Sequence, residues 1–182
     1  MAPEFDAVSV VGVSGSPAAT SRSRTLLEGA LGALERYGTR VRQIDLAGLS
    51  ADALLARRHD PAVADALAAV LGARIIVVST PTYRATYSGL LKVFFDLLPQ
   101  DALAGKVAVA IATGATPAHF LAIDHGVRPL LASVGAVVVP TGVYGVDSQF
   151  RDGVTDPALL DRLDRAVAEA AALAGLVPAL GA

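Results

Sequence analysis

Residues 8–24 (VSVVGVSGSPAATSRSR) join an apolar run to a loop of small and hydroxyl-bearing residues, a combination that suits an anion. Gly12 and Gly15 let the backbone turn tightly and approach a ligand. If a helix begins near the arginines, its free N–H groups add to the hydrogen bonds that hold a phosphate. The same pattern also fits an ordinary strand-to-helix turn with an N-cap serine. The side chains that can hydrogen-bond an anion in this stretch are Ser14, Ser16, Thr20, Ser21, Arg22, Ser23 and Arg24.

The loop does not match the standard nucleotide-binding motifs. Residues 12–16 (GVSGS) lack the glycine spacing of G-x-G-x-x-G, and Lys106 is followed by Val107 where a P-loop has Ser or Thr. The nucleophile elbow of serine hydrolases, G-x-S-x-G, fails by one residue, because Ser16 stands where its last glycine belongs. The loop therefore predicts a phosphate cradle for a mononucleotide and disfavours a serine hydrolase.

Composition excludes several classes of protein. A chain of 182 residues can bury one full core, and we expect a single domain over residues 1–182. Although 53% of the residues are hydrophobic, no apolar run reaches the roughly 20 residues of a membrane span. The net charge of −2 disfavours nucleic acid as a partner.

The first residues and the metal-ligating residue types bear on location and metal binding. Residues 1–8 carry Glu4 and Asp6 and no basic residue, unlike a signal peptide, so we expect a cytoplasmic protein. Without cysteine, and with histidines not spaced as ligands, no metal site is predicted.

Apolar runs alternate with helical patterns along the chain. Most of the runs are continuous, which is typical of strands buried on both faces of a sheet. The alternation predicts an α/β fold, a flavodoxin-like doubly wound five-stranded parallel sheet of order 2-1-3-4-5. The predicted strands are residues 7–13, 41–44, 75–79, 107–112 and 136–140, and the helical stripes are Leu27-Leu31-Leu34, closed by Gly38, and Val63-Leu67-Val70-Leu71.

In that architecture the loops that follow the first, third and fourth strands converge on one crevice. These loops are residues 14–24, 80–88 and 113–119, and all are rich in Gly, Ser, Thr and Pro. The second loop adds Tyr83 and Tyr87, whose rings can stack on a flat heteroaromatic ligand or merely cover the end of the sheet. Together the loops predict a ligand with both a phosphate and a planar ring.

Several segments resemble the NADPH-dependent FMN reductases, and in particular the reductase component of two-component alkanesulfonate and methanesulfonate monooxygenases. The similarity covers roughly residues 8–150, and Ala115 departs from it because the family usually has a second glycine there. The segments that carry it are GSPxxxSRS at 15–23, PTYRATYSGLLK at 81–92, DLLPQ at 96–100, IATG at 111–114, and His119 through Gly145-Val-Asp147.

The resemblance implies a set of cofactor-binding residues and no catalytic acid, base or nucleophile, because a hydride passes directly from NADPH to FMN. Ser16, Ser21, Arg22 and Ser23 would hold the FMN phosphate, and Arg22 or Arg24 could meet the 2′-phosphate of NADPH. The complete set of expected cofactor-binding residues is Ser14, Ser16, Ser21, Arg22, Ser23, Pro81, Thr82, Tyr83, Arg84, Thr113, Gly114, Ala115 and His119.

A helix is predicted over residues 118–134 with a fault in its middle. Pro129 has no N–H to donate to the carbonyl of His125, so the helix has to kink or widen. The resemblance implies that the fault is a π-helical turn at a tetramer interface, with His125 at the position of an inserted aromatic residue involved in flavin exchange. A simple proline kink is the alternative. Asp124 and Arg128 are expected to form a surface ion pair. The predicted apolar face of this helix consists of Phe120, Ile123, Val127, Leu130, Leu131 and Val134.

The sequence therefore predicts an NAD(P)H-dependent FMN reductase that supplies reduced FMN to a flavin-dependent monooxygenase. The alternatives are a quinone, azo or metal-ion reductase with FMN as a prosthetic group, and a flavodoxin-like electron carrier without catalysis. The high apolar content and the segment from Leu90 to Leu98, hydrophobic nearly all round, predict a homo-oligomer, either a dimer or a tetramer.

Overall fold

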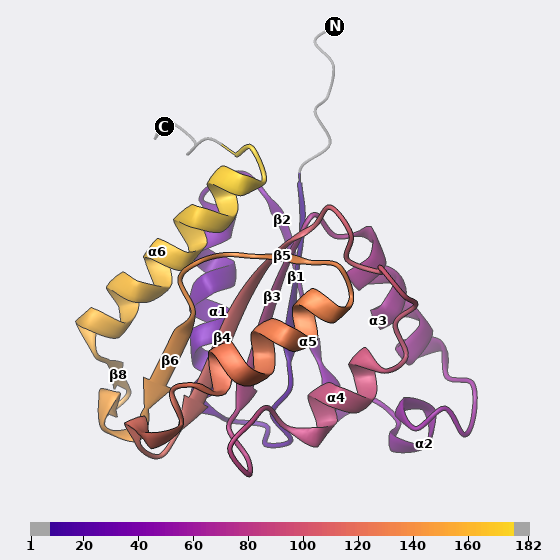
Figure 1. Ribbon diagram of the computed structural model, residues 1–182, viewed down its shortest axis with the longest axis horizontal. Coiled ribbons are helices and arrows are strands. Elements are labelled where there is room, and N and C mark those ends of the chain that lie inside the picture. The colour runs from indigo at the N-terminus through magenta and orange to yellow at the C-terminus, as the bar shows by residue number, and fades with distance from the viewer. Residues whose placement is uncertain (1–7, 177–182) are drawn as a thin grey trace, which may run out of the picture.

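The computed structural model describes residues 8–176 and contains a parallel sheet in the order β2-β1-β3-β4-β5, with β6 also paired to β4 (Figure 1). The predicted α/β fold and strand order are confirmed. The strands of the sheet are β1 (Ser9–Ser14), β2 (Arg40–Asp45), β3 (Ile75–Pro81), β4 (Val107–Gly114), β5 (Val137–Val138) and β6 (Val143–Val146). The main helices are α1 (Arg22–Glu35), α2 (Ala51–Leu54), α3 (Pro61–Gly72), α4 (Gly89–Phe95), α5 (Arg128–Ser133) and α6 (Pro157–Leu173).

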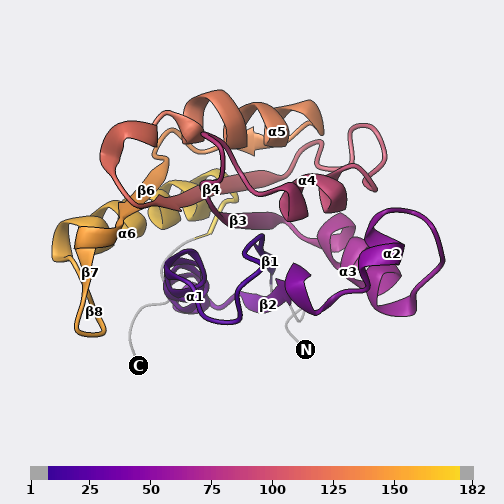
Figure 2. The ribbon, with the colours of Figure 1, turned by 90° about the horizontal axis from the view of Figure 1, so that it is seen from below.

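Alternate residues of the central strands pack into two separate hydrophobic cores, one on each face of the sheet. Val11 and Val13 of β1 pack with α3, α4 and α5, whereas Val10 packs with α1 and α6 on the opposite face. Figure 2 shows the sheet between these layers, with α5 and α4 on one side and α1 on the other. Gly12 leaves room for α1, because a Cβ at this position would lie 2.7 Å from Leu31 Cδ1. Two buried faces explain why the strands are apolar throughout.

The predicted fifth strand is wrong in its extent. Only Val137 and Val138 form β5, and the same edge of β4 is continued by β6, which the sequence analysis did not identify. Pro140 has no N–H for the ladder, and Thr141 instead donates both its N–H (2.8 Å) and its hydroxyl (2.6 Å) to the carboxylate of Glu169 on α6. The detour carries the chain toward the carboxyl end of β4, where β6 runs beside residues 111–114.

Two apolar side chains are placed differently from the prediction. Leu71 is 40% exposed although it was expected on the buried stripe of α3, and Phe120 is 56% exposed because it precedes the regular part of its helix. In the segment from Leu90 to Leu98, four apolar side chains are buried in the core of their own chain, and three more are half-buried: Leu91, Phe94, Phe95 and Leu98 are buried, and Leu90, Val93 and Leu97 are half-buried. The exposed apolar side chains lie elsewhere, at Phe120 and Leu121 among others.

Beyond the sheet, a short 3-10 turn η4 (Asp147–Gln149) leads into an antiparallel hairpin, β7 (Phe150–Arg151) with β8 (Val154–Thr155). Ala7, assigned to the first strand, and the N-terminal residues expected to lack a signal peptide lie outside the described residues. Within residues 8–176 no helix combines the length and the apolar character required to cross a membrane.

Candidate functional site

A cavity of about 340 Å³ opens at the carboxyl ends of β1, β3 and β4. The three loops predicted to converge all contribute to it, and a fourth segment, after β6, adds a carboxylate. Ligands of doubly wound sheets bind in this place. The cavity is lined by Ser16, Ala18, Thr20, Ser21, Arg22, Pro81, Thr82, Tyr83, Thr113, Gly114, Ala115 and Asp147.

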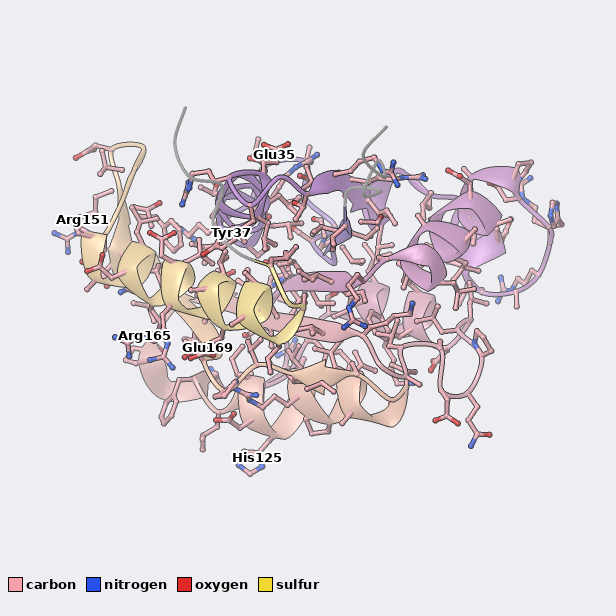
Figure 3. The ribbon with its side chains drawn as sticks, turned by 90° about the horizontal axis from the view of Figure 1, so that it is seen from above. Glu35, Tyr37, His125, Arg151, Arg165 and Glu169 are labelled. Atoms are coloured by element: carbon pink, nitrogen blue, oxygen red, sulfur yellow. The ribbon has the colours of Figure 1, made fainter. Side chains whose placement is uncertain are left out.

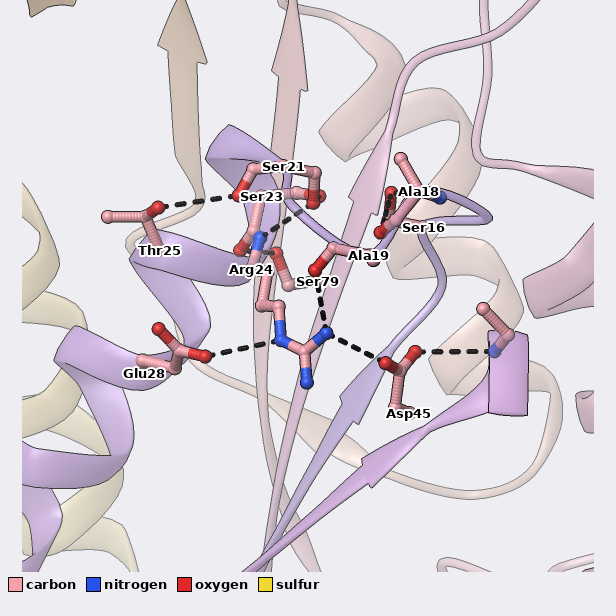
Figure 4. Close-up of polar contacts among 11 residues, drawn as sticks. Ser16, Ala18, Ala19, Ser21, Ser23, Arg24, Thr25, Glu28, Asp45 and Ser79 are labelled. Carbon is pink, nitrogen blue, oxygen red and sulfur yellow. Dashed lines mark hydrogen bonds and ion pairs between the residues drawn. The ribbon is translucent and has the colours of Figure 1, made fainter. Parts of the chain in front are cut away.

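The first loop presents hydroxyl groups and the start of α1. Ser21 is the N-cap, and its Oγ accepts the N–H of Arg24 at 3.2 Å while lying 3.1 Å from Ser23 Oγ (Figure 4). Ser16 Oγ accepts the N–H of Ala18 at 3.2 Å, which closes the loop on itself. The helix that follows is 14 residues long, so its N-terminus carries a substantial positive end.

Arg24 supports this loop from outside the cavity. Its guanidinium donates to the carbonyl of Ala19 and to the Asp45 carboxylate, both at 2.8 Å, and to Glu28 at 3.2 Å (Figure 4). With three acceptors engaged, Arg24 fixes the loop to the end of β2. Asp45, which makes this possible, was not among the residues identified from the sequence.

Arg22 lies at the cavity but is paired with a carboxylate. One of its terminal nitrogens is 2.7 Å from Asp147 Oδ1, and its guanidinium carbon lies 6.0 Å from the centre of the Phe150 ring. Both partners of the ion pair are about half exposed, at 47% for Arg22 and 44% for Asp147. The sequence placed Asp147 in a segment that resembles the family but indicated no role for it, because the strand before it, β6, was not predicted.

The second loop contains a tight hairpin turn. Tyr83 and Thr86 exchange backbone hydrogen bonds, N–H to carbonyl, at 2.8 and 3.3 Å, and the two residues between them, Arg84 and Ala85, have φ angles of 51° and 69°. Positive φ at both central positions defines a type I′ turn, which usually contains Asn and Gly. Ser88 joins the loops, because its Oγ donates to the carbonyl of Gly15 at 2.5 Å.

Thr82, on the wall of the cavity, has an unsatisfied hydroxyl. Its backbone N–H donates to the carbonyl of Thr113 at 2.7 Å, but its Oγ1 is buried and has no hydrogen-bond partner. A buried hydroxyl without a partner is unfavourable, and a ligand that hydrogen-bonds it would remove that cost. The third loop contributes Thr113, Gly114 and Ala115 beside it.

Four of the predicted site residues lie outside the cavity lining. Ser14 and Ser23 are buried beneath the loop, and the carbonyl of Ser23 accepts the hydroxyl of Ser79 at 2.6 Å. Arg84 is exposed at the tip of the hairpin turn. His119 is exposed in the 3-10 turn η2 (Pro117–His119).

The fault in the predicted helix is a π-helical segment, η3 (Ile123–Val127), and His125 lies within it. The N–H of Arg128 donates to the carbonyl of Ile123, five residues back, as a π turn requires. The side chain of His125 points outward from the molecule (Figure 3). The expected ion pair is present, with Arg128 Nε 2.7 Å from Asp124 Oδ1.

The π-helical segment contacts the hairpin turn of the second loop. Gly126 is buried there, and a Cβ at this position would overlap Thr86 Oγ1 and approach Tyr87 Cδ1 to 3.4 Å. Thr86 is in turn bonded to Tyr83 on the cavity wall, so a continuous chain of contacts joins the π-helical segment to the cavity.

A larger cavity, of about 650 Å³, lies on the other side of β6, between η3 and α6. Phe120, Arg128 and Arg162 line it, and Tyr144 stands between it and Gly114. Both arginines there are bonded to backbone carbonyls: Arg128 to Val139 at 2.7 Å, and Arg162 to Gly142 at 2.6 Å. The smaller cavity, by contrast, adjoins the N-terminus of a long helix and contains the unsatisfied hydroxyl of Thr82.

Lys106, considered above for a P-loop, lies just before β4, at the opposite end of the sheet from this site. Its ammonium donates to the carbonyls of Leu71 (2.7 Å) and Ala73 (2.9 Å). Burial, with a smaller contribution from Arg74, lowers the pKa of Lys106. The lysine therefore joins α3 to the sheet and has no contact with the cavity.

Comparison with known proteins places the chain in a family. A sequence profile described as NADPH-dependent FMN reductase matches residues 8–151. The FMN reductase (NADPH) of Escherichia coli K12 is 39% identical over 163 residues, 87% of this chain and 85% of that protein. The NADH-dependent FMN reductase SfnE of Pseudomonas putida is 34% identical and covers 95% of this chain and 96% of its own.

Solved structures agree with this result. The apo form of the NADH:FMN oxidoreductase EmoB superposes with a TM-score of 0.84 at 39% identity, over 95% of this chain and 92% of that chain. A flavodoxin from Streptococcus pneumoniae, at 18% identity and a TM-score of 0.63 over 91% of this chain and 99% of its own, shares the fold. The chain belongs to the NADPH-dependent FMN reductase family of oxidoreductases.

Proposed function

We propose that this chain transfers a hydride from NADPH to FMN and releases reduced FMN to a partner flavin-dependent monooxygenase. FMN supplies the hydride-accepting chemistry when bound, and the protein positions it. The observation that carries the proposal is one cavity that joins a hydroxyl-lined helix N-terminus to a wall with an unsatisfied threonine hydroxyl.

The phosphate end of FMN fits the first loop. The hydroxyls of Ser16, Thr20 and Ser21 line the cavity beside the first N–H groups of α1, and phosphates bind well to such a helix start. Ser14 and Ser23, buried beneath the loop, support its shape rather than contact the ligand directly.

The ring end fits the other two loops. Pro81, Thr82 and Tyr83 line the cavity beside Thr113 and Ala115, and together they offer a hydroxyl, an aromatic ring and small side chains. No acid or base within this lining is required, because orienting the two rings for direct transfer is the contribution of the protein. Ala115 limits the space at that edge by one methyl group.

Steady-state kinetics test whether FMN is a substrate. NADPH oxidation should saturate with added FMN, and riboflavin, which lacks the phosphate, should show a higher KM at similar kcat. In a prosthetic-group reductase, by contrast, added FMN has no effect once the site is filled. Absence of NADPH oxidation with any flavin would favour the electron carrier and contradict the proposal.

The proposal also covers the oligomeric state of the protein and its cellular location. We infer that residues 1–182 act as one flavodoxin-like domain, assembled as a dimer or a tetramer in the cytoplasm, where NADPH is produced. The high hydrophobic content of the chain supports assembly. Transfer to the monooxygenase then proceeds by release of reduced FMN, which a shallow, partly open site allows.

A further inference from the structure

Asp147 places a negative charge in a cavity whose other features attract a phosphate. Its carboxylate lines the cavity with Ser16, Thr20 and Ser21, and it engages Arg22, the cationic side chain of that lining nearest to the helix start. A carboxylate beside a bound phosphate repels it and also occupies the cation that would otherwise neutralise it.

The two members of this ion pair are positioned by different elements. Asp147 directly follows β6, which is paired to β4 through Val146 and Gly114, and the turn is held because the N–H of Val146 donates to Gln149 Oε1 at 3.0 Å. Arg22 is the first residue of α1, and its guanidinium, at the end of a long side chain that is 47% exposed, lies 6.0 Å from the centre of the Phe150 ring. The backbone that carries Asp147 is therefore held by the sheet, whereas the Arg22 guanidinium is several rotatable bonds away from α1.

We propose that Asp147 competes with the FMN phosphate for Arg22 and thereby keeps FMN binding weak enough for exchange. This inference depends on the proposed function, in which FMN enters and leaves in each cycle. Without a ligand, Arg22 is held by Asp147 at 2.7 Å. When a phosphate at the start of α1 takes the nitrogen of Arg22 that now bonds Asp147, this ion pair breaks, and its loss lowers the net gain in binding free energy.

The experiment measures equilibrium binding of FMN and of riboflavin by flavin fluorescence, without turnover, in wild type, Asp147→Asn, Arg22→Gln and the double variant. Asp147→Asn should lower the Kd of FMN about fivefold, the upper range for a half-exposed ion pair, and slow FMN release. The Kd of riboflavin should change less than about twofold, since it has no phosphate. With Arg22→Gln already present, Asp147→Asn should have a smaller effect than in wild type.

A matched control is Asp65→Asn, which removes the same charge from an exposed pair with Arg42, distant from the cavity. It should leave both Kd values unchanged, which excludes an effect of net charge alone. If Asp147→Asn fails to fold, Asp147→Ser tests the same competition.

Weaker or unchanged FMN binding in Asp147→Asn would overturn the inference, because Asp147 would then only brace the turn over the cavity. Equal tightening of FMN and riboflavin would overturn it too. These outcomes differ from failure of the proposed function, in which added FMN does not support NADPH oxidation, whatever the binding constants are.

Discussion

Among the residues that the structure describes, Thr82 has the only buried side-chain polar atom without a hydrogen-bond partner. The hydroxyl and the γ-methyl of a threonine exchange positions by rotation about χ1, so a ligand in the cavity can recruit the hydroxyl that is unused in its absence. Such a residue lowers the stability of the ligand-free protein and gains its partner on binding.

Replacing Thr82 tests whether its hydroxyl lowers the stability of the ligand-free protein and contributes to ligand affinity. Thr82→Val keeps the shape and removes the buried hydroxyl, so the free energy of unfolding of the ligand-free protein should rise by about 1 kcal/mol in urea titration. The affinity for both FMN and riboflavin should fall, since the wall lies away from the phosphate loop. Thr82→Ser, which retains the hydroxyl, should preserve affinity. A Thr82→Val variant with no gain in stability would show that the hydroxyl is already satisfied.

At the scale of elements, two turns of the same kind carry different residues. The hairpin between β7 and β8 turns at Asp152 and Gly153, with φ of 52° and 77°, a favoured pair for type I′. The turn beside the cavity uses Arg84 and Ala85 in the same left-handed region. For residues with a Cβ this region costs about 1–2 kcal/mol each, so the turn beside the cavity is held in an unfavourable conformation by its surroundings.

Ala85→Gly should relieve part of this cost. The variant should raise the free energy of unfolding by about 0.5–1 kcal/mol, since the gain exceeds the entropy that glycine loses on folding. The matched control is Ala68→Gly in the exposed part of α3, which should lower it by about 1 kcal/mol. Urea unfolding measures both values, and equal signs for the two variants would contradict the strain assigned to this turn.

The π-helical segment provides the second element-scale prediction. Deleting His125 should remove the extra residue of the wide turn and let η3 return toward α spacing, which turns the preceding residues by about 100° relative to those after it. The contact of Gly126 with Thr86, and with it the cavity wall, should change. The variant should copurify with FMN and appear yellow, and its NADPH oxidation with added FMN should fall sharply.

The control for this deletion is His125→Ala, which keeps the chain length and removes only an exposed side chain. Its effect on flavin retention and turnover should be mild. If the deletion variant were colourless and turned over at the wild-type rate, the wide turn would have no part in flavin exchange.

At the scale of the whole molecule, some large apolar side chains stay exposed on the surface. Phe120 and Leu121 are 56% and 46% exposed next to the π-helical segment, whereas the apolar residues of α4 are buried or half-buried. Light scattering at micromolar concentration should give the molar mass of a dimer or a tetramer. Phe120→Glu should lower this molar mass, because it places a charge on the apolar surface expected at the interface. Leu160→Glu, at a position 41% exposed on α6, is the control. A monomeric wild type would disprove the predicted assembly.

Much of this arrangement is encoded locally. Continuous apolar runs predict strands buried on both faces, and the small residues after residues 13, 79 and 112 predict the three loops that form the cavity. Pro129 predicts that the helix kinks or widens near His125, because a missing N–H interrupts the helix wherever the chain goes, and the structure shows that it widens.

The contacts that define the site were decided only by tertiary structure. Arg22 and Asp147 are 125 residues apart in sequence, and their pairing depends on β6 taking the edge of β4 after the interruption at Pro140. Likewise, the exposure of Leu71 and Phe120 depends on where their helices meet other elements. Periodicity specifies which residues share a face, but which distant group lies opposite that face is fixed only when the layers pack.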